Sequence, residues 1–424
     1  MGHLLVIESW VGSMSRLLPR AIREEGHEFT FVTRDLHHYL RSAPEGEGPH
    51  PLLTARNVIT ADTNDTAGLL AGIEGLHTVL GFDGVVSSCD YYLPAVAHTA
   101  HRLGLPGPAP EAVEAACRKD LTRRVLAAAD VPGPRFAICE GAGEAAAAAR
   151  GIGYPLVVKP VDLCAGMLVR AVRDEHELER ACQALAEFPV NARGQDRAPV
   201  ILLEELLRGP EVSVETVSFG GSTHVVGVTD KSIGGAPAFI ETGHMFPAGI
   251  DGSLASEAAE TTLRAVKALG LDQVVCHTEL KLTADGPRLV EVNPRPAGNR
   301  ITELVRHVSG VDLATACVDV ALGRAPDLAP RTTGVRSAAV AFLLPDTTGT
   351  LAGIDGAGAV RARPEVLELT LAEPGRTVRA ATSNNEYLGH VMTADTEGGG
   401  ARASAERLLA GLHPRYAPAP VVPA

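Results

Sequence analysis

Two stretches of alternating apolar and polar residues, 274–282 and 288–293, carry the clearest pattern in the chain. Such alternation is typical of β-strands with one buried face. The polar face of the first stretch carries Glu279, and the second places Glu291 and Asn293 on one face. The pattern therefore predicts a hairpin that can bring two carboxylates and an amide together.

The turn between these strands decides whether the two glutamates meet. A three-residue loop, Ala284-Asp285-Gly286, pairs Thr283 with Pro287 and sets Glu279 directly opposite Glu291. A two-residue loop would put them on opposite faces. Glycine in the third position suits a three-residue loop that ends in the left-handed conformation. We predict the three-residue loop and a facing pair.

Two facing carboxylates repel each other unless a cation lies between them. Glu279, Glu291 and the amide oxygen of Asn293 are hard oxygen donors, which suit Mg²⁺. Arg295 follows between Pro294 and Pro296, so a stiff segment holds a second cation nearby. The alternative is an ordinary hairpin with a solvated acidic face.

Elsewhere the pattern divides the chain into three parts. Over 1–110, short buried strands alternate with amphipathic helices, which predicts a doubly wound parallel sheet. Its strands are expected at 3–8, 29–33, 58–60, 78–80 and 84–86. The first loop has a single glycine, Gly12, where a dinucleotide-binding fingerprint needs three, which argues against NAD.

The part from 111 to 325 mixes helices with strands that end in charged residues. We expect a small lobe over 111–199 and a large lobe over 200–325. Its helices are expected at 111–129, 144–151, 175–187, 253–269 and 302–322, and its other strands at 136–139, 154–159, 200–207, 212–217, 223–229 and 238–242. Lys159 closes an apolar strand, where it needs an anionic partner or must extend to solvent.

After residue 325 the chain predicts a small α+β unit, 326–424. Its strands are expected at 336–344, 349–354, 366–371 and 387–394, with a helix at 401–412 and a loose Pro/Ala-rich tail from 417.

Composition limits the class of protein. The 424 residues include 45% hydrophobic ones and carry a net charge of −13, which argues against nucleic acid or an anionic membrane as the main partner. Seven cysteines without a CxxC pair, and an N-terminus that reads as a first strand rather than a signal peptide, predict a cytoplasmic protein with reduced thiols.

The order of these pieces is specific. A helix-borne Lys119, the strand-end Lys159, a strand that ends in Glu204-Glu205 and the hairpin segment LVEVNPRPAGN resemble the ATP-grasp superfamily of carboxylate–amine ligases over essentially the whole chain. Within the superfamily the chain is most similar to the branch of L-amino-acid ligases and carnosine synthases, and the segment ETGHMFPA, 241–248, supports this placement. The resemblance implies an N-terminal domain, a two-part ATP-grasp domain and a C-terminal lid.

The same resemblance implies a role for each matching residue. Lys119 and Lys159 would contact the ATP phosphates, Glu204, Glu205 and the backbone to Leu207 would read adenine, and Glu211 would hold the ribose. Glu279, Glu291 and Asn293 would bind Mg²⁺, with Mn²⁺ as the alternative, and Arg295 would steady an acyl phosphate. Glu241 and His244 would lie on a loop that faces an amino-acid substrate. The phosphate-covering loop, 161–167, departs from the family pattern because Gly166 is its only glycine, so few of its positions tolerate a positive φ.

The implied reaction is ATP-dependent joining of an amino-acid carboxylate to an amine, with ADP and phosphate as products. Two alternatives stay open: a biotin-carboxylase-like or purine-biosynthetic member of the superfamily, and a non-catalytic nucleotide-binding protein. The implied partners are small carboxylates and amines, and the family suggests a homodimer. Substrate choice is expected from loops around Ser9-Trp10 and 87–92, from 241–248 and from the lid near 384–386.

Overall fold

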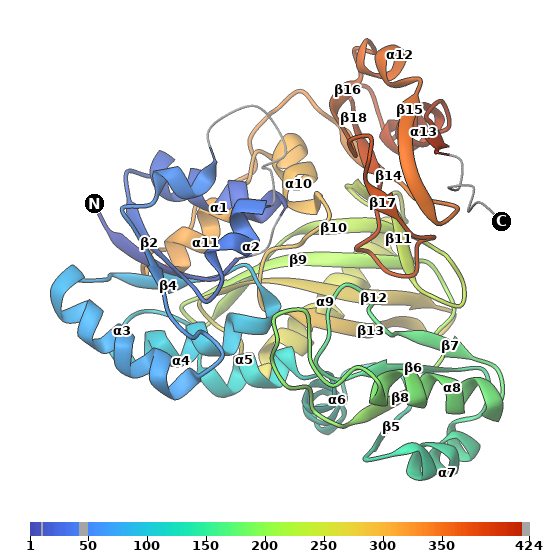
Figure 1. Cartoon of the computed structure of the whole chain (residues 1–424), viewed down its shortest axis with the longest axis horizontal. Helices are drawn as coiled ribbons and strands as arrows, with labels where there is room; N and C mark the ends of the chain where they lie inside the picture. The colour runs from blue at the N-terminus through green and yellow to red at the C-terminus, as the bar shows by residue number, and fades with distance from the viewer. Residues whose placement is uncertain (10–11, 42–49, 418–424) are drawn as a thin grey trace, which may run out of the picture.

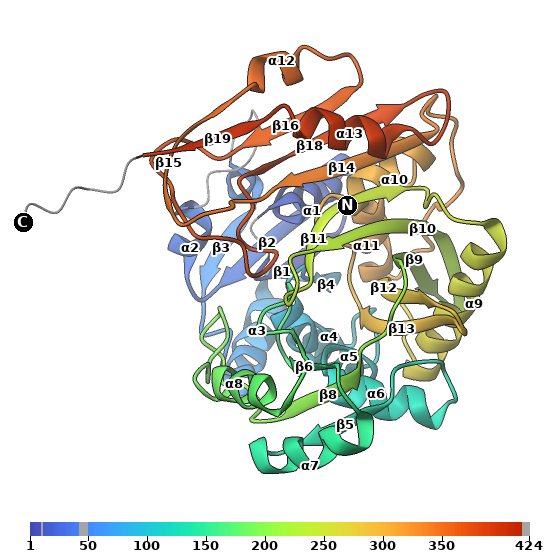
Figure 2. The same cartoon turned by 90° about the vertical axis from the view of Figure 1, so that its right-hand side faces the viewer.

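The computed structural model describes residues 1–9, 12–41 and 50–417, which form three regions around one long sheet (Figures 1 and 2). Trp10 and the tail beyond residue 417 lie outside the described residues. No helix in the described ranges is long and apolar enough to cross a membrane.

The N-terminal region is a four-stranded parallel sheet with helices on it, as its pattern predicts. The strand order is β3-β2-β1-β4. Its strands are β1 (His3–Ile7), β2 (Glu28–Thr33), β3 (Asn57–Thr60) and β4 (Gly84–Val86), and its helices are α1 (Ser13–Glu24), α2 (Leu36–Arg41), α3 (Thr66–Leu80) and α4 (Leu93–Leu103), with short 3-10 turns η1 (Pro51–Thr54) and η2 (Asp90–Tyr92).

The strand expected at 78–80 is wrong, because these residues form the last turn of α3. The Asp65 side chain accepts the Gly68 N–H at the start of that helix, and Gly81 ends it in the left-handed conformation. Two good caps therefore outweigh the strand preference of Thr78 and Val79.

A second four-stranded sheet forms the small lobe (Figure 1). Its order is β5-β8-β6-β7 and all its pairs are antiparallel. The strands are β5 (Phe136–Cys139), β6 (Leu156–Pro160), β7 (Arg170–Val172) and β8 (Ile201–Glu205), and the helices on them are α7 (Ala142–Ile152) and α8 (Glu175–Ala186). Since β8 pairs with β5 and β6, we propose that the small lobe extends to the end of β8 rather than to residue 199.

The helix expected over 111–129 is divided into α5 (Pro110–Cys117) and α6 (Lys119–Ala128). Arg118 between them has an extended backbone, and the backbone N–H of Lys119 donates to the carbonyl of Val161 at 2.9 Å. The break thus ties the start of α6 to the loop 161–167. The helix expected over 302–322 is likewise divided, because Gly310 adopts a left-handed φ of 73° between α10 (Ile301–Ser309) and α11 (Leu313–Ala321).

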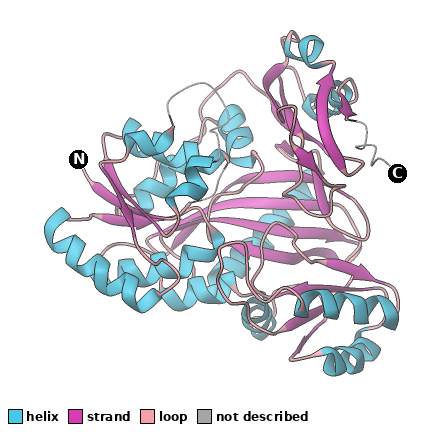
Figure 3. Cartoon of the chain, viewed as in Figure 1, coloured by secondary structure: helices cyan, strands magenta, loops and turns pink. Residues whose placement is uncertain are grey.

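The largest sheet runs through the large lobe and the C-terminal region. Its strand order is β13-β12-β9-β10-β11-β14-β18-β16 (Figures 1 and 3). Its first five strands are β9 (Glu211–Phe219), β10 (Ser222–Gly234), β11 (Ile240–Phe246), β12 (Val274–Thr283) and β13 (Gly286–Asn293). Helix α9 (Gly252–Leu269) covers one face through Ala258, Ala265 and Val266, which are fully buried. The opposite face of these strands is polar and carries the candidate site.

The C-terminal region supplies the other three strands. It contains β14 (Ser337–Leu343), β15 (Gly349–Asp355), α12 (Ala357–Arg361), β16 (Val366–Leu371), β17 (Thr377–Val378), β18 (Gly389–Asp395), α13 (Ala401–Leu409) and β19 (His413–Tyr416). β14 pairs with β11 at four positions, and β15 joins β17 and β19 in a separate sheet. The short elements α12, β17 and β19 were not expected from the pattern.

Candidate active site

The β12–β13 hairpin sets Glu279 opposite Glu291, as predicted, but by a different route. Thr283 pairs with Gly286, so the loop has two residues and the predicted three-residue loop is wrong. Gly286 does have a positive φ, of 100°. Val290 is an extra, bulged residue that restores the phase, because Leu280 pairs with Leu289 while Glu279 pairs with Glu291.

Three rows of polar side chains cross the face of the sheet at this hairpin. One row runs from Glu291 to Glu279 and Ser213 on neighbouring strands, and the next joins Asn293, His277 and Glu215. The third row is made of Lys281 on β12, Glu211 on β9, Lys231 on β10 and His244 on β11. Facing side chains in such rows are close neighbours, so polar and charged side chains from five strands meet here.

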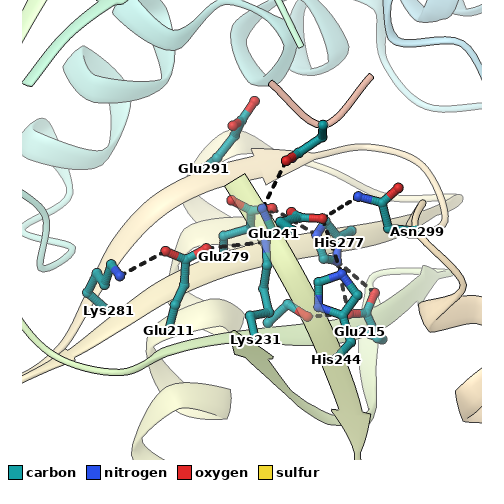
Figure 4. A network of polar contacts seen from close by, with 12 residues as sticks. Glu211, Glu215, Lys231, Glu241, His244, His277, Glu279, Lys281, Glu291 and Asn299 are labelled. Carbon is teal, nitrogen blue, oxygen red and sulfur yellow. Dashed lines mark hydrogen bonds and ion pairs between the residues drawn. The ribbon is translucent and has the colours of Figure 1, made fainter. Parts of the chain in front are cut away.

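Lys231 holds the acidic side chains of this face together (Figure 4). Its Nζ lies 2.5 Å from Glu279 Oε1, 3.0 Å from Glu241 Oε1 and 3.3 Å from Glu211 Oε1, and its side chain is 1% exposed. Burial alone would lower the pKa of Lys231, but the three carboxylates raise it well above its usual value. The lysine is therefore a fixed cation inside the acidic cluster.

Glu241 and His244 lie on strand β11, so the prediction that they lie on a loop is wrong. The strand pairs with β10 on one side and with β14 on the other. The residues around Glu241 do not indicate the pairing with either strand. Thr242 is skipped in the pairing with β10, which brings Glu241 and His244 onto one face. His244 Nε2 lies 3.2 Å from Glu241 Oε2, and Asn299 Nδ2 also donates to that oxygen.

His277 joins the acidic residues of two rows. Its Nδ1 lies 2.9 Å from Glu215 Oε1 and its Nε2 lies 3.1 Å from Glu279 Oε1. Burial would lower the pKa of His277, but Glu215 and Glu279 together raise it to about 9. The imidazolium therefore offsets part of the negative charge at Glu279.

Glu291 has a cation of its own, Lys119 from the start of α6. Lys119 Nζ lies 3.0 Å from Glu291 Oε1 and donates to the carbonyl of Leu163 at 2.6 Å. Burial opposes the charge of Lys119, yet Glu291 raises its pKa above the ordinary value. The facing glutamates are thus compensated separately, Glu279 by Lys231 and Glu291 by Lys119.

Lys159 has the anionic partner that its position requires. Its Nζ lies 2.6 Å from Glu204 Oε2, while Arg123 Nε lies 2.5 Å from Glu204 Oε1, and all three side chains are buried. Burial would raise the pKa of Glu204, but the two cations lower it to about 2. Arg123 also donates to the carbonyl of the bulged Val290 at 2.6 Å, which links the small lobe to the hairpin.

The segment that joins β8 to β9 passes very close to β12. Glu205, the last residue of β8, accepts from Arg135 at 2.6 Å and from Arg288 at 2.7 Å, and Leu207 follows it, half-buried. Gly209 has a φ of 140°, and a Cβ there would lie 1.9 Å from the carbonyl oxygen of Leu282. Glu211, expected at the ribose, lies 3.0 Å from Lys281 Nζ and 3.3 Å from Lys231 Nζ in this structure.

The segment 161–168, which includes the loop expected to cover the phosphates, contains more left-handed residues than its single glycine suggests. Ala165, Gly166 and Leu168 have φ values of 55°, 67° and 58°. Loop geometry therefore does not depend on glycine alone, although each non-glycine residue costs about 1–2 kcal/mol in this conformation. The Asn384 N–H donates to the carbonyl of Ala165 at 3.3 Å, so this loop contacts the C-terminal region.

Arg295 lies at the boundary with the N-terminal region. Its Nε donates to Asp90 Oδ1 at 2.7 Å and its Nη1 to the carbonyl of Pro296 at 2.9 Å. Burial would lower the pKa of Arg295, but Asp90 raises it above its already high value. Arg295 is therefore a permanent cation whose orientation depends on a different domain.

The residues expected to hold a divalent metal fit that role by their chemistry. Within the described ranges, no group of three or more His, Cys, Asp and Glu side chains is arranged to hold a metal ion. The expected set is smaller, since it consists of two carboxylates and the amide of Asn293 beside them on β13. Mg²⁺ takes few protein ligands and completes its shell with water and phosphate oxygens, so such a set is appropriate.

Sequence reasoning missed Lys231 and Asp90. The pattern ended the strand of Lys231 at Thr229, although β10 continues to Gly234. If the expected strand had been extended two residues beyond Thr229, the alternation would have placed Lys231 on the same face as Thr229. Asp90 lies in the 87–92 segment, but no local pattern indicates that it meets a residue more than two hundred positions away.

Comparison with known proteins defines the class of this fold and site. Three family models match: an ATP-grasp N-terminal domain over residues 20–107, an ATP-grasp domain over 152–303 and the L-amino acid ligase C-terminal domain 2 over 341–417. The uncharacterized protein y4rH of Sinorhizobium fredii is 30% identical over 337 residues, which cover 79% of this chain and 68% of that protein. The chain belongs to the ATP-grasp family, whose members bind ATP together with a divalent metal.

Within this family, the similarity is to enzymes that join amino acids. Human carnosine synthase 1 is 32% identical over 346 residues, which cover 78% of this chain but only 41% of that protein. A crystal structure of an L-amino acid ligase from Bacillus licheniformis has the same fold, with a TM-score of 0.82, 24% identity and 99% of each chain covered.

Proposed function

We propose that this protein is an ATP-dependent ligase that activates an amino-acid carboxylate as an acyl phosphate and joins it to an amine. The observation that carries the proposal is the facing pair Glu279–Glu291, which lies between Lys119 and Lys231. The names of similar proteins, carnosine synthase and L-amino acid ligase, support the same chemistry.

ATP would bind between the small lobe and the hairpin. An ammonium group has three N–H donors. In the described chain Lys159 uses one of them, on Glu204, and Lys119 uses two, on Leu163 and Glu291, so both keep donors for phosphate oxygens. The backbone of Glu204 to Leu207 would read adenine, Glu211 would hold the ribose, and the loop around Gly166 would cover the phosphates.

Lys231 is different, because its three donors already meet three carboxylates. It fixes the charge balance of the site and has no donor left for a substrate in this arrangement. Glu279, Glu291 and Asn293 would hold Mg²⁺, with Mn²⁺ as the alternative. Such an ion supplies positive charge to the transferring phosphoryl group.

The reaction needs two bond exchanges. A substrate carboxylate oxygen attacks the γ-phosphorus, and the bond to the ADP oxygen breaks. A neutral amine nitrogen then attacks the acyl carbon, the bond from carbon to the phosphate oxygen breaks, and phosphate leaves while the nitrogen loses a proton. Arg295 would steady the phosphate and the developing oxyanion. Glu241 and His244 would contact the amino-acid substrate. Neither step requires a nucleophilic serine or cysteine.

A coupled assay of ADP release over pairs of amino acids tests the proposal, with mass spectrometry of the products. We expect ADP release that depends on both partners, a condensation product, and a loss of at least a hundredfold in turnover for Glu291→Gln. ADP release driven by bicarbonate instead of an amine would favour the carboxylase alternative. Binding of ATP without turnover of any pair would contradict the ligase assignment.

A homodimer and a cytoplasmic location stay predictions from the sequence.

A further inference from the structure

Arg295 depends on the N-terminal region for its orientation. Asp90 Oδ1 accepts the Nε–H of Arg295 at 2.7 Å, and the exposed fractions of the two side chains are only 15% and 14%. A charge-assisted bond to Nε fixes the plane of a guanidinium group. Together with the bond from Nη1 to Pro296, it leaves Nη2 as the nitrogen without a hydrogen bond among the described residues.

Asp90 is itself held firmly. It begins η2, which follows a three-residue segment, 87–89, after the carboxyl end of β4. Strand β4 is the edge strand of the parallel sheet (Figure 1). Beside it, the N–H of the fully buried Cys89 donates to Ser87 Oγ at 3.1 Å, and Ser87 Oγ donates to the carbonyl of Glu8 at 3.3 Å. On the other side, the Tyr92 hydroxyl donates to Asn64 at 3.0 Å. The carboxylate thus projects from a segment with little freedom to shift.

We propose that Asp90 is a positioning residue for the ligase reaction: it aims Arg295 at the phosphate of the acyl intermediate and makes the N-terminal region part of the catalytic unit. This inference rests on the proposed function. A misplacement of about 1 Å in a charge-stabilising group can cost on the order of a hundredfold in rate. Asp90 acts through Arg295, so its loss should lower kcat far more than it raises the KM for ATP.

The kinetic test compares Asp90→Asn and Asp90→Ala with Asp319→Asn. Asp319 is a matched control, since its carboxylate is also 15% exposed and lies 2.7 Å from Arg324 away from the site. We expect Asp90→Ala to lower kcat on the order of a hundredfold with less than about a threefold change in the KM for ATP. Asp90→Asn keeps an acceptor and should fall between it and the wild type, while Asp319→Asn should match the wild type.

A double variant gives a second criterion. If Asp90 acts only through Arg295, Asp90→Ala combined with Arg295→Ala should be no slower than Arg295→Ala alone. Additive losses, a change confined to KM, or an equal loss in Asp319→Asn would overturn the proposal. Melting curves of each variant show whether a loss of rate reflects unfolding.

A measurement without turnover separates this inference from the proposed function. With nitrogen-15-labelled arginine, the Nε–H signal of Arg295, assigned through Arg295→Lys, should exchange slowly with water in the wild type and at least tenfold faster in Asp90→Ala. An unchanged signal would refute the role of Asp90 even in an active enzyme. Conversely, a wild type that shows the slow signal but no amine-dependent ADP release would refute only the ligase assignment.

Discussion

The charge of Lys231 has a large expected effect on stability. Three carboxylates whose side chains are only 9%, 13% and 16% exposed share this one buried ammonium, and removal of one partner of a buried ion pair leaves the other charge uncompensated.

We therefore expect Lys231→Met to lower the free energy of unfolding by about 3–5 kcal/mol. Denaturant unfolding measures this, with Lys267→Met as the control, because Lys267 is exposed on α9 and should change stability by less than about 0.5 kcal/mol. A loss below about 1 kcal/mol for Lys231→Met would mean that the carboxylates do not depend on this cation.

Glu204 gives a prediction about pH. Its pKa falls from 4.5 to about 2 on folding, so its ionised form stabilises the protein above about pH 4.5 and that contribution disappears as the pH falls toward 2. Glu204→Gln should therefore be less stable than the wild type at pH 7, and the difference should narrow between pH 4.5 and 2.

Unfolding free energies across this pH range measure the effect. The exposed Glu260→Gln serves as control and should follow the wild type at every pH. A difference between Glu204→Gln and wild type that stays constant down to pH 2 would show that the carboxylate is not stabilised by Arg123 and Lys159.

At the scale of elements, the connection from β8 to β9 approaches the backbone of β12 closely at Gly209. Gly209 tolerates no side chain, because its φ is 140° and a Cβ would overlap the carbonyl oxygen of Leu282. Gly209→Ala should cost about 1–3 kcal/mol in stability and weaken ADP binding, since it displaces the segment proposed to read adenine.

Thermal unfolding and calorimetry of ADP binding measure both effects. Gly75→Ala, inside α3 where a Cβ meets nothing within 4 Å, should instead leave binding unchanged and raise stability by up to about 1 kcal/mol. Equal behaviour of the two variants would argue against a steric role for Gly209.

Most of the helices and strands could be predicted from the sequence. The features that could not be predicted share one cause. The facing of Glu279 and Glu291 depends on the bulge at Val290, since the predicted turn is wrong, whereas the parallel sheet and the hairpin follow from local alternation and turn residues. The bulges at Val290 and Thr242 do not, because a bulge is fixed by the partner strand and not by the residues beside it. For the same reason the chain indicated Lys159 and its need for an anion but not the third member, Arg123, which also bonds the bulged carbonyl.

At the scale of the whole molecule, the eight-stranded sheet and the separate sheet of the small lobe determine which regions can move. The C-terminal region shares the eight-stranded sheet with the candidate site, whereas the small lobe has a sheet of its own (Figures 1 and 2). Motion of the C-terminal region relative to the site would break the hydrogen bonds between β11 and β14. Motion of the small lobe breaks no strand pair with the large sheet.

Hydrogen exchange with and without Mg-ADP tests this difference. We expect the amides of 161–172 to gain protection when nucleotide binds, and those of β14 to exchange slowly in both states. Fast exchange of β14 in the absence of nucleotide would indicate that the C-terminal region opens as a true lid.

The shared sheet also limits how the chain can be recombined with its relatives. The family match for the C-terminal domain begins at residue 341, in the middle of β14. A crossover there would join half of one strand to half of another and disturb the pairing that supports Glu241 and His244. Removal of the strand would leave β11 as an unprotected edge, open to aggregation. A workable crossover lies between Gly323 and Arg336, where no helix or strand is interrupted, so modular exchange in this family should follow the strands and not the boundaries of sequence domains.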